Sequence, residues 1–252
     1  MAVIFITASL ATVQSQTKSS QPKLPLPIHH FEVRAGFLGG YTNLVDQYYT
    51  EIPYYGSTIG GMMGFSYSKD NMTHDLEITF DRADATLDTK PEYKLNQTYF
   101  KGTYTFLYEF SDESGSRLRV YSGGSLDFLD ATRNYNQFAN NYQTYEFAGS
   151  VNLVFRIEYL VSESFQLTIG DQVRAPFFAM VKQPELGGEP GKLKFGSWDL
   201  WQDIGNKFYL QKAIGNRHHI ALDYRFEYYT IHSDREVNQV HQAIGLSYGY
   251  HF

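Results

Sequence analysis

Large apolar side chains alternate with polar or small ones along most of the sequence. The pattern is clearest in the segment 144–159, where Phe155 and Ile157 alternate with Arg156 and Glu158. A period of two residues is typical of a β-strand that has one apolar face. The same alternation recurs and predicts ten strands. Their ranges are 30–41, 57–68, 73–82, 95–110, 117–130, 144–159, 165–175, 197–213, 219–230 and 239–252.

The connections between the predicted strands are alternately long and short. Among the long ones are 43–55, 131–143 and 177–196, whereas 215–217 is a tight turn. The segment before the first strand and the C-terminus both fall on the side of the short turns. An even number of strands with this asymmetry is typical of barrels that cross an outer membrane. The sequence therefore predicts an all-β fold, a closed antiparallel up-and-down transmembrane barrel of about ten strands.

The final strand, 239–252, ends the chain on an aromatic residue. One of its faces carries Leu246, Tyr248, Tyr250 and Phe252. An exposed aromatic strand edge invites aggregation, and a closed barrel has no such edge. The ending resembles the last strand of Gram-negative outer-membrane β-barrels. This resemblance implies a location in the outer membrane of the cell envelope, surrounded by its lipid. It also implies that Tyr248, Tyr250 and Phe252 are a signal read by the barrel assembly machinery.

Composition removes several other classes of protein. Aromatic residues make up 17% of the 252 residues, yet the mean hydropathy is only −0.38. No internal apolar run approaches the ~18 residues that a membrane-spanning helix requires. The net charge of −6, without a basic cluster, argues against a nucleic-acid partner. Because the chain has no cysteine, disulfides and thiolate metal sites are excluded.

The N-terminal residues differ in character from the predicted barrel. Val3 to Ala11 fits the apolar core of a signal peptide, and Val13 and Ser15 fit cleavage after Ser15. The basic residues that usually begin a signal peptide are missing, which is consistent with a truncated start. The alternative to a signal peptide is a short buried strand or helix. We therefore expect a signal peptide at 1–15, a proline-rich periplasmic lead-in at 16–28 and the barrel at 29–252.

If the apolar faces contact lipid, the opposite faces place many charges inside a narrow barrel. We expect opposite charges to pair there, for example Arg117 or Arg119 with Glu158 and Glu109. The alternative is a thin path for ions, but the need to compensate buried charges favours a structural lattice. The residues predicted to form this lattice are Glu109, Arg117, Arg119, Arg156, Glu158, Asp223, Arg225 and Glu227.

Three histidines fall on inward positions at one rim. His30 begins the first strand, His219 begins the ninth, and His251 lies in the last. In a closed barrel these three strands are neighbours, so the imidazoles are candidates for a zinc or copper site. The alternative is that they are polar residues lining the barrel mouth. Strand stagger could separate them, and this favours the second interpretation; we therefore predict neither a bound metal nor a cofactor.

An enzyme would need a catalytic set at the opposite rim. Asp81, Asp84 and Asp88 lie near the top of the third strand, and His232 and Asp234 follow the ninth. Carboxylates facing a His–Asp pair could activate water, and the set loosely resembles that of the ten-stranded omptin proteases. Its spacing and order do not reproduce the omptin pattern, so no catalytic residue is assigned.

The sequence thus favours a non-catalytic barrel that acts through its extracellular loops. The expected roles are binding, adhesion or membership of a larger envelope complex with a protein partner, because tyrosine and asparagine suit recognition surfaces. The loops in question are 43–55, 131–143 and 177–196. A narrow pore for ions or small solutes is the second hypothesis, and a hydrolase at the extracellular rim is the third.

Overall fold

The computed structural model describes residues 29–252 except 48–49, 112–116, 137–141, 184–190 and 233–235, so the predicted signal peptide and lead-in lie outside it. Within these ranges, no helix has the length and apolar character needed to cross a membrane. The strands are β1 (His29–Asp46), β2 (Thr50–Lys69), β3 (Met72–Leu87), β4 (Lys90–Glu109), β5 (Leu118–Tyr135), β6 (Tyr142–Ser162), β7 (Leu167–Lys182), β8 (Leu193–Gly196), β9 (Trp201–Ile214), β10 (His218–Ile231) and β11 (Val237–His251).

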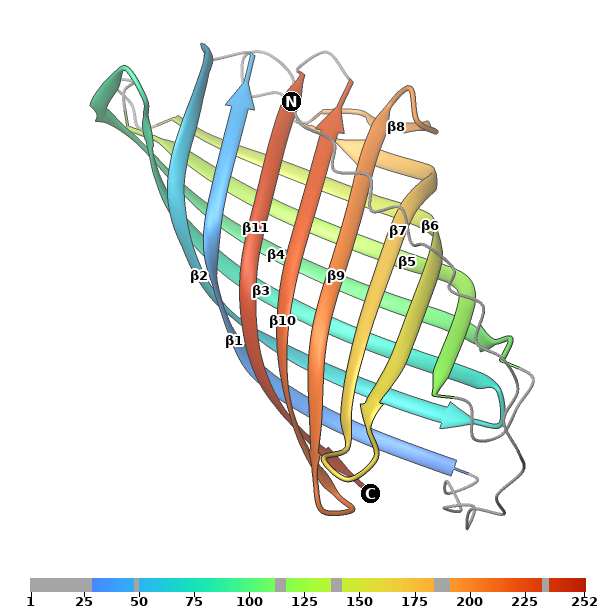
Figure 1. The fold of residues 1–252 in the computed structure, drawn as a ribbon. Coiled ribbons are helices and arrows are strands. Elements are labelled where there is room, and N and C mark those ends of the chain that lie inside the picture. Colours follow the sequence, from blue (N-terminus) through green and yellow to red (C-terminus); the bar gives the residue numbers. More distant parts are fainter. Residues whose placement is uncertain (1–28, 48–49, 112–116, 137–141, 184–190, 233–235) are drawn as a thin grey trace, which may run out of the picture.

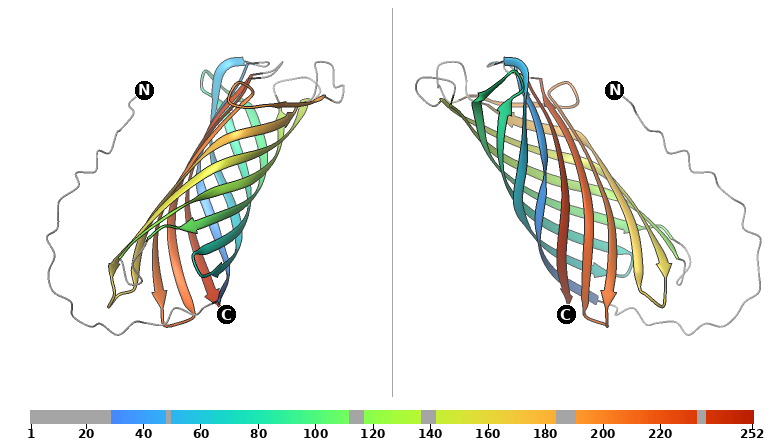
Figure 2. Two further views of the ribbon diagram at one scale, coloured as in Figure 1. Left: turned by 90° about the vertical axis from the view of Figure 1, so that its right-hand side faces the viewer. Right: turned by 60° about the vertical axis from the view of Figure 1, so that its left-hand side comes forward.

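The strands form a closed antiparallel barrel (Figures 1 and 2). Each long strand pairs with the next along the chain, and β11 pairs with β1 from Glu32↔His251 to Asp46↔Val237. The four-residue β8 pairs only with residues 179–182 of β7. Residues 167–174 of β7 pair with β9, which completes the wall. Ten strands therefore make the barrel wall, and the predicted fold is confirmed. We call the end where β1 begins and β11 ends the terminal end, and the opposite end the loop end.

An apolar belt surrounds the barrel in the half nearer the terminal end. Phe37, Ile59, Leu126 and Leu153 point outward there and are 79%, 73%, 56% and 66% exposed, respectively. The alternate residues of the same strands point inward and are mostly charged or polar. This is the polarity that a wall between lipid and a polar interior requires.

The polarity of the wall reverses toward the loop end. On β3, Ala83, Ala85 and Leu87 point inward and are buried, whereas Arg82 and Asp84 point outward and are exposed. Apolar residues inside and polar residues outside are what a β-barrel surrounded by water requires. The strands therefore continue past the belt as an extension with an apolar core, which we call the tower.

The tower corrects the predicted long loops, because most of their residues belong to strands. The predicted loop 43–55 reduces to residues 47–49 between β1 and β2. Similarly, β5 and β6 extend into the predicted loop 131–143, and β7 and β8 extend into 177–196. These segments are rich in Tyr, Asn, Gly and Pro, and this composition predicts loops. In the structure, their alternation has the opposite sense to that of the belt.

The predicted strand 197–213 also needs correction at its start. Residues 197–200 form a turn, in which the Leu200 N–H donates to the Ser197 carbonyl at 3.0 Å, and β9 begins at Trp201. The turn directs Leu200 into the tower core, where it is 8% exposed, although the strand alternation placed it outside.

Arginine substitutions on the outer face of β5 test where the belt ends. Leu126→Arg should destabilise the barrel by about 2–4 kcal/mol, because it places a charge near the middle of the lipid layer. The matched control is Asn134→Arg, an exposed outward position on β5 within the tower, and it should change stability little. Urea titration of both variants in lipid vesicles measures the difference, and equal destabilisation would contradict this position of the belt.

Candidate functional site

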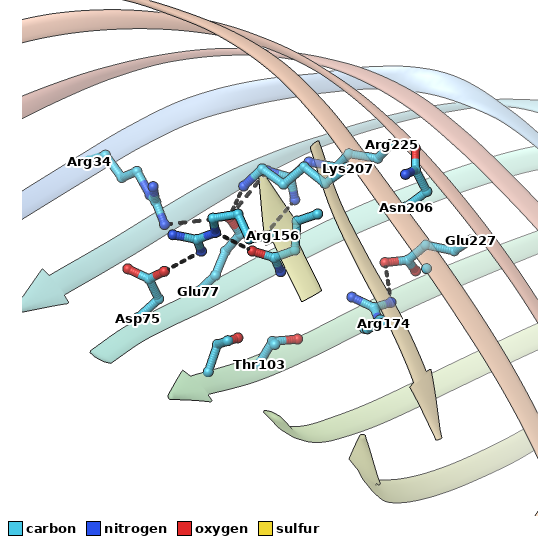
Figure 3. Close-up of a pocket in the computed structure, with 13 residues that line it drawn as sticks. Arg34, Asp75, Glu77, Thr103, Arg156, Arg174, Asn206, Lys207, Arg225 and Glu227 are labelled. Carbon is cyan, nitrogen blue, oxygen red and sulfur yellow. Dashed lines mark hydrogen bonds and ion pairs between the residues drawn. The ribbon is translucent and has the colours of Figure 1, made fainter. Parts of the chain in front are cut away.

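A carboxylate bound by three cations lies in the interior at the level of the belt (Figure 3). Glu77 of β3 accepts a hydrogen bond from Arg225 of β10 at 2.7 Å and another from Lys207 of β9 at 2.8 Å. Arg34 Nη2 of β1 lies 3.9 Å from the same carboxylate. The residues come from four strands, so these ion pairs tie opposite walls of the barrel together.

A second group of charges lies beside the first, nearer the tower. Glu227 of β10 accepts a hydrogen bond from Arg174 at 2.7 Å and another from Lys101 at 3.3 Å. The Lys101 ammonium also lies 3.4 Å from Asp203 and 3.7 Å from Asp127. Each cation therefore contacts several carboxylates, which is how buried charges are compensated in a low-dielectric interior.

The interior retains little free volume. One cavity of about 50 Å³ lies among these charges and is lined by Glu77, Arg156, Arg174, Arg225 and Glu227, among others (Figure 3). A volume of about 10–15 Å³ on this measure holds one water molecule, so the cavity has room for a few. A cavity of this size is not a channel for solutes.

The tower core closes the barrel above these charges. Trp201 and Tyr229 stack with ring centroids 5.2 Å apart, and the Tyr135 hydroxyl donates to Asp46 at 2.7 Å. The residues of this core are all apolar or aromatic. They are Leu44, Tyr54, Ala85, Leu87, Leu95, Tyr99, Leu129, Ala131, Tyr135, Ala148, Ala179, Val181, Leu200, Trp201, Tyr229, Ile231 and Val237.

One ion pair is embedded beside the tower core. Arg133 Nη1 lies 2.5 Å from Glu146 Oε2, and both side chains are fully buried. Arg133 also contacts the Tyr229 hydroxyl and the Gln239 side chain. The apolar core and this pair together occupy the interior of the barrel at the loop end.

The structure brings most of the predicted lattice residues together. Arg156 pairs with Asp75 of β3, and Asp223, Arg225 and Glu227 belong to the two groups of charges described above. Nearer the terminal end, Arg119 Nε lies 3.9 Å from Glu158 Oε2.

Of the other predicted lattice residues, Arg117 lies outside the barrel, whereas Glu109 lies on the inward face of β4 at the rim. Arg117 is exposed just before β5 and pairs with Glu163 at 3.1 Å, not with Glu158 or Glu109. Its hydrogen bond to Glu163 raises the pKa of Arg117 above its ordinary value. Glu109 is half-buried at the end of β4 and accepts a hydrogen bond from Ser111. The predicted strand began at Arg117, one residue before β5 begins, and so placed this rim residue inside.

The predicted lattice omitted three interior arginines, namely Arg34, Arg133 and Arg174. Arg174 carries the expected signal, because it lies between outward-facing Val173 and Ala175 in a predicted strand. Arg133 has no such signal, since it lies among inward apolar residues in a segment that resembles a loop.

The three predicted rim histidines do lie together. His219 Nδ1 is 3.1 Å from His251 Nε2, and the rings of His30 and His251 have centroids 4.0 Å apart. Glu32 of β1 joins them, 3.4 Å from His219 Nε2 and 3.5 Å from His251 Nδ1. The closure of β11 on β1 creates this group, which we call the seam cluster.

The residues considered for a hydrolase do not converge. Asp81 points into the barrel and is 3% exposed, whereas Asp84 points outward and lies 3.7 Å from Arg82. Asp88 and His232 are exposed near the loop end, and Asp234 lies outside the described residues. Because Asp81 and Asp84 occupy opposite faces of β3, they do not form the carboxylate pair that the hydrolase hypothesis required.

Comparison with known proteins identifies the fold. The sequence matches no protein-family profile and no curated protein. Among solved structures, the outer membrane protease OmpT from Escherichia coli aligns with a TM-score of 0.50 and 6% identity over 89% of this chain and 96% of that chain. The translocator domain of the autotransporter NalP from Neisseria meningitidis aligns with a TM-score of 0.44 and 9% identity over 91% of each chain.

The class of protein follows from the fold and the belt. The chain is a β-barrel of the type found in the outer membranes of Gram-negative bacteria. Its closed wall and apolar belt span the membrane, and an outer-membrane location accords with both features.

Substitution of Glu77 tests the contribution of the interior charges. Glu77→Ala leaves Arg34, Lys207 and Arg225 without their shared anion, and such a loss typically costs about 3–5 kcal/mol. The matched control is Glu163→Ala, which removes an exposed ion pair and should change stability little. Unfolding of both variants in detergent by urea measures the effect. The same small change in both would contradict a structural role for the interior charges.

Proposed function

We propose that this protein is a closed, non-catalytic outer-membrane barrel whose tower presents a binding surface outside the cell. The observation that carries the proposal is the tower itself, in which strands continue beyond the belt around an apolar core. A pore gains nothing from a core that fills its own opening. A rigid wall that projects beyond the lipid instead provides a preorganised surface for a partner.

The partner surface in this proposal lies on β6, β7 and β8. Phe195 of β8 is 63% exposed, and its ring stacks on Phe178 of β7 with centroids 6.3 Å apart. Trp198 in the turn after β8 and Tyr145 of β6 are also exposed, and the Tyr145 hydroxyl donates to Asp130 at 2.6 Å. Aromatic side chains are enriched at protein–protein interfaces and among their energetically dominant residues. We therefore propose a protein partner, such as another subunit of an envelope complex.

The register supports a position for this surface at the loop-end edge of the belt. On β5 the outward residues change from Phe128 to Asp130, and Tyr145 pairs with Thr132, farther toward the loop end than Asp130. Phe195 pairs with Met180 on the part of β7 that continues past its contact with β9. Tyr145 therefore lies beyond this change from apolar to polar outward residues, whereas Phe195, in register through Met180 and Gly149 with Phe128, lies at its edge.

Site-specific cross-linking in intact cells tests the proposed surface. A photoreactive amino acid in place of Phe195 should give one discrete cross-linked protein, because this side chain would lie against the partner. The matched position is Asn134, exposed on β5 in the same tower, and should give none. Equal products from both positions, or none from position 195, would contradict the proposal. Steady current from the unmodified protein in planar bilayers would support the pore hypothesis instead.

We also propose that the last strand carries the assembly signal. Tyr248, Tyr250 and Phe252 alternate along one face, and Phe252 is 73% exposed at the terminal end. Its ring lies 4.9 Å from that of Tyr250 and 5.6 Å from that of Phe31. The side chain is therefore accessible to the assembly machinery as well as to lipid.

Replacement of the terminal aromatic tests this signal. Phe252→Asp should abolish accumulation in the outer-membrane fraction, because the machinery would no longer recognise the strand. Phe165→Asp is the control, since Phe165 is 68% exposed in a turn at the same end but lies outside the last strand. Cell fractionation and immunoblotting compare the two variants. Normal accumulation of the Phe252→Asp protein would refute the signal.

A further inference from the structure

We propose that His30, Glu32 and His251 bind a divalent transition-metal ion, with zinc as the best-fitting ion. One ligand atom from each of these residues lies within 4.8 Å of the other two. His30 and Glu32 belong to β1 and His251 ends β11, so the ion would join the first and last strands. The proposal stands independently of the binding function assigned to the tower.

The contacts of the seam cluster leave a place for one additional cation. Each neutral imidazole carries one N–H and one lone pair. His219, His251 and Glu32 meet in three contacts of 3.1, 3.4 and 3.5 Å, but the two imidazoles supply only two protons. Two lone pairs must therefore face each other in one of the contacts. A cation between those two atoms removes the repulsion.

The contact between Glu32 Oε2 and His251 Nδ1 is the best position for the ion. Among the described residues, His251 Nδ1 has no hydrogen-bond partner. The other carboxylate oxygen, Oε1, lies 3.8 Å from Arg34 Nη1 and already has a nearby cation. With the ion on Nδ1, the Nε2–H of His251 donates to His219 Nδ1, and the remaining N–H of His219 faces Glu32 Oε1. Every contact in the cluster then has a donor or a cation.

His219 acts as a positioning residue in this arrangement. It is 1% exposed, and its ring lies against Gly249 of β11. A Cβ at position 249 would be 2.0 Å from His219 Cε1, so only glycine leaves room for the imidazole there. A second group that holds a ligand histidine in one orientation is a regular feature of metal sites.

The ligand set favours zinc among the divalent ions. Imidazole nitrogen and carboxylate oxygen bind zinc at ~2.0–2.2 Å, which separates tetrahedral ligands by about 3.3–3.5 Å. The 3.5 Å between His251 Nδ1 and Glu32 Oε2 matches this separation. His30 is half-buried at the rim, and its ligand nitrogen lies within 4.8 Å of the ligand atoms of Glu32 and His251. Two histidines and one carboxylate leave the fourth position to water.

Zinc binding to the folded full-length barrel tests the proposal. Protein prepared without a histidine tag and treated with a chelator is titrated with zinc against a chromophoric chelator. We expect one zinc ion per barrel and a higher urea midpoint of unfolding with zinc, because the ion binds only the closed seam. His219→Gln should weaken zinc binding about 10–100-fold, and His251→Gln should weaken it further.

The matched control is His218→Gln. His218 is adjacent to His219 but points to the other face of β10, where its ring stacks on Tyr248 with centroids 5.8 Å apart. This variant should bind zinc as the unmodified barrel does. His30→Gln provides a second ligand variant at the strand edge, and a gel-mobility assay verifies that each variant is folded. Absence of stoichiometric zinc from the unmodified barrel, or equal losses in His218→Gln and His251→Gln, would overturn the proposal.

Discussion

Every backbone N–H and C=O group within the belt must find its hydrogen-bond partner inside the protein, because lipid offers none. An open sheet would leave two unpaired edges in the membrane. The pairing of β11 with β1 along nearly the whole of both strands removes them. The rest of the structure depends on this closure, because it fixes which side chains face inward and brings residues from opposite ends of the chain together.

Closure of a ten-stranded wall also produces an interior that must be filled. At the level of the belt the inward side chains are mostly charged or polar, so the buried carboxylates are stabilised by neighbouring cations. Glu77 illustrates this, since its three cations come from β1, β9 and β10. In the tower the exterior is water and the apolar residues turn inward. The same wall therefore has a polar interior in the membrane and an apolar interior outside it.

The filled core of the tower links the fold to the proposed function. The cavity beside Glu77 has a volume of only about 50 Å³, and Trp201 and Tyr229 stack above it in the tower core. Because the barrel is filled, the proposed binding sites lie on its surfaces. They are the aromatic side chains of β6 to β8 and the seam cluster at the terminal end. The two surfaces lie at opposite ends of the wall, so a partner at one leaves the other free.

The sequence determined the class of fold. It also determined which face of each belt strand contacts lipid, because in strands such as β6 the large apolar residues all lie on one face. It also supplied the three rim histidines and most of the interior charges. Only the tertiary structure showed that the tower continues these strands, since the alternation reverses once water replaces lipid. The strand register also places Glu32 beside the histidines and Arg133 beside Glu146, and it places Arg117 outside the interior. The sequence alone did not show these neighbours, because register depends on contacts between residues that are distant in sequence.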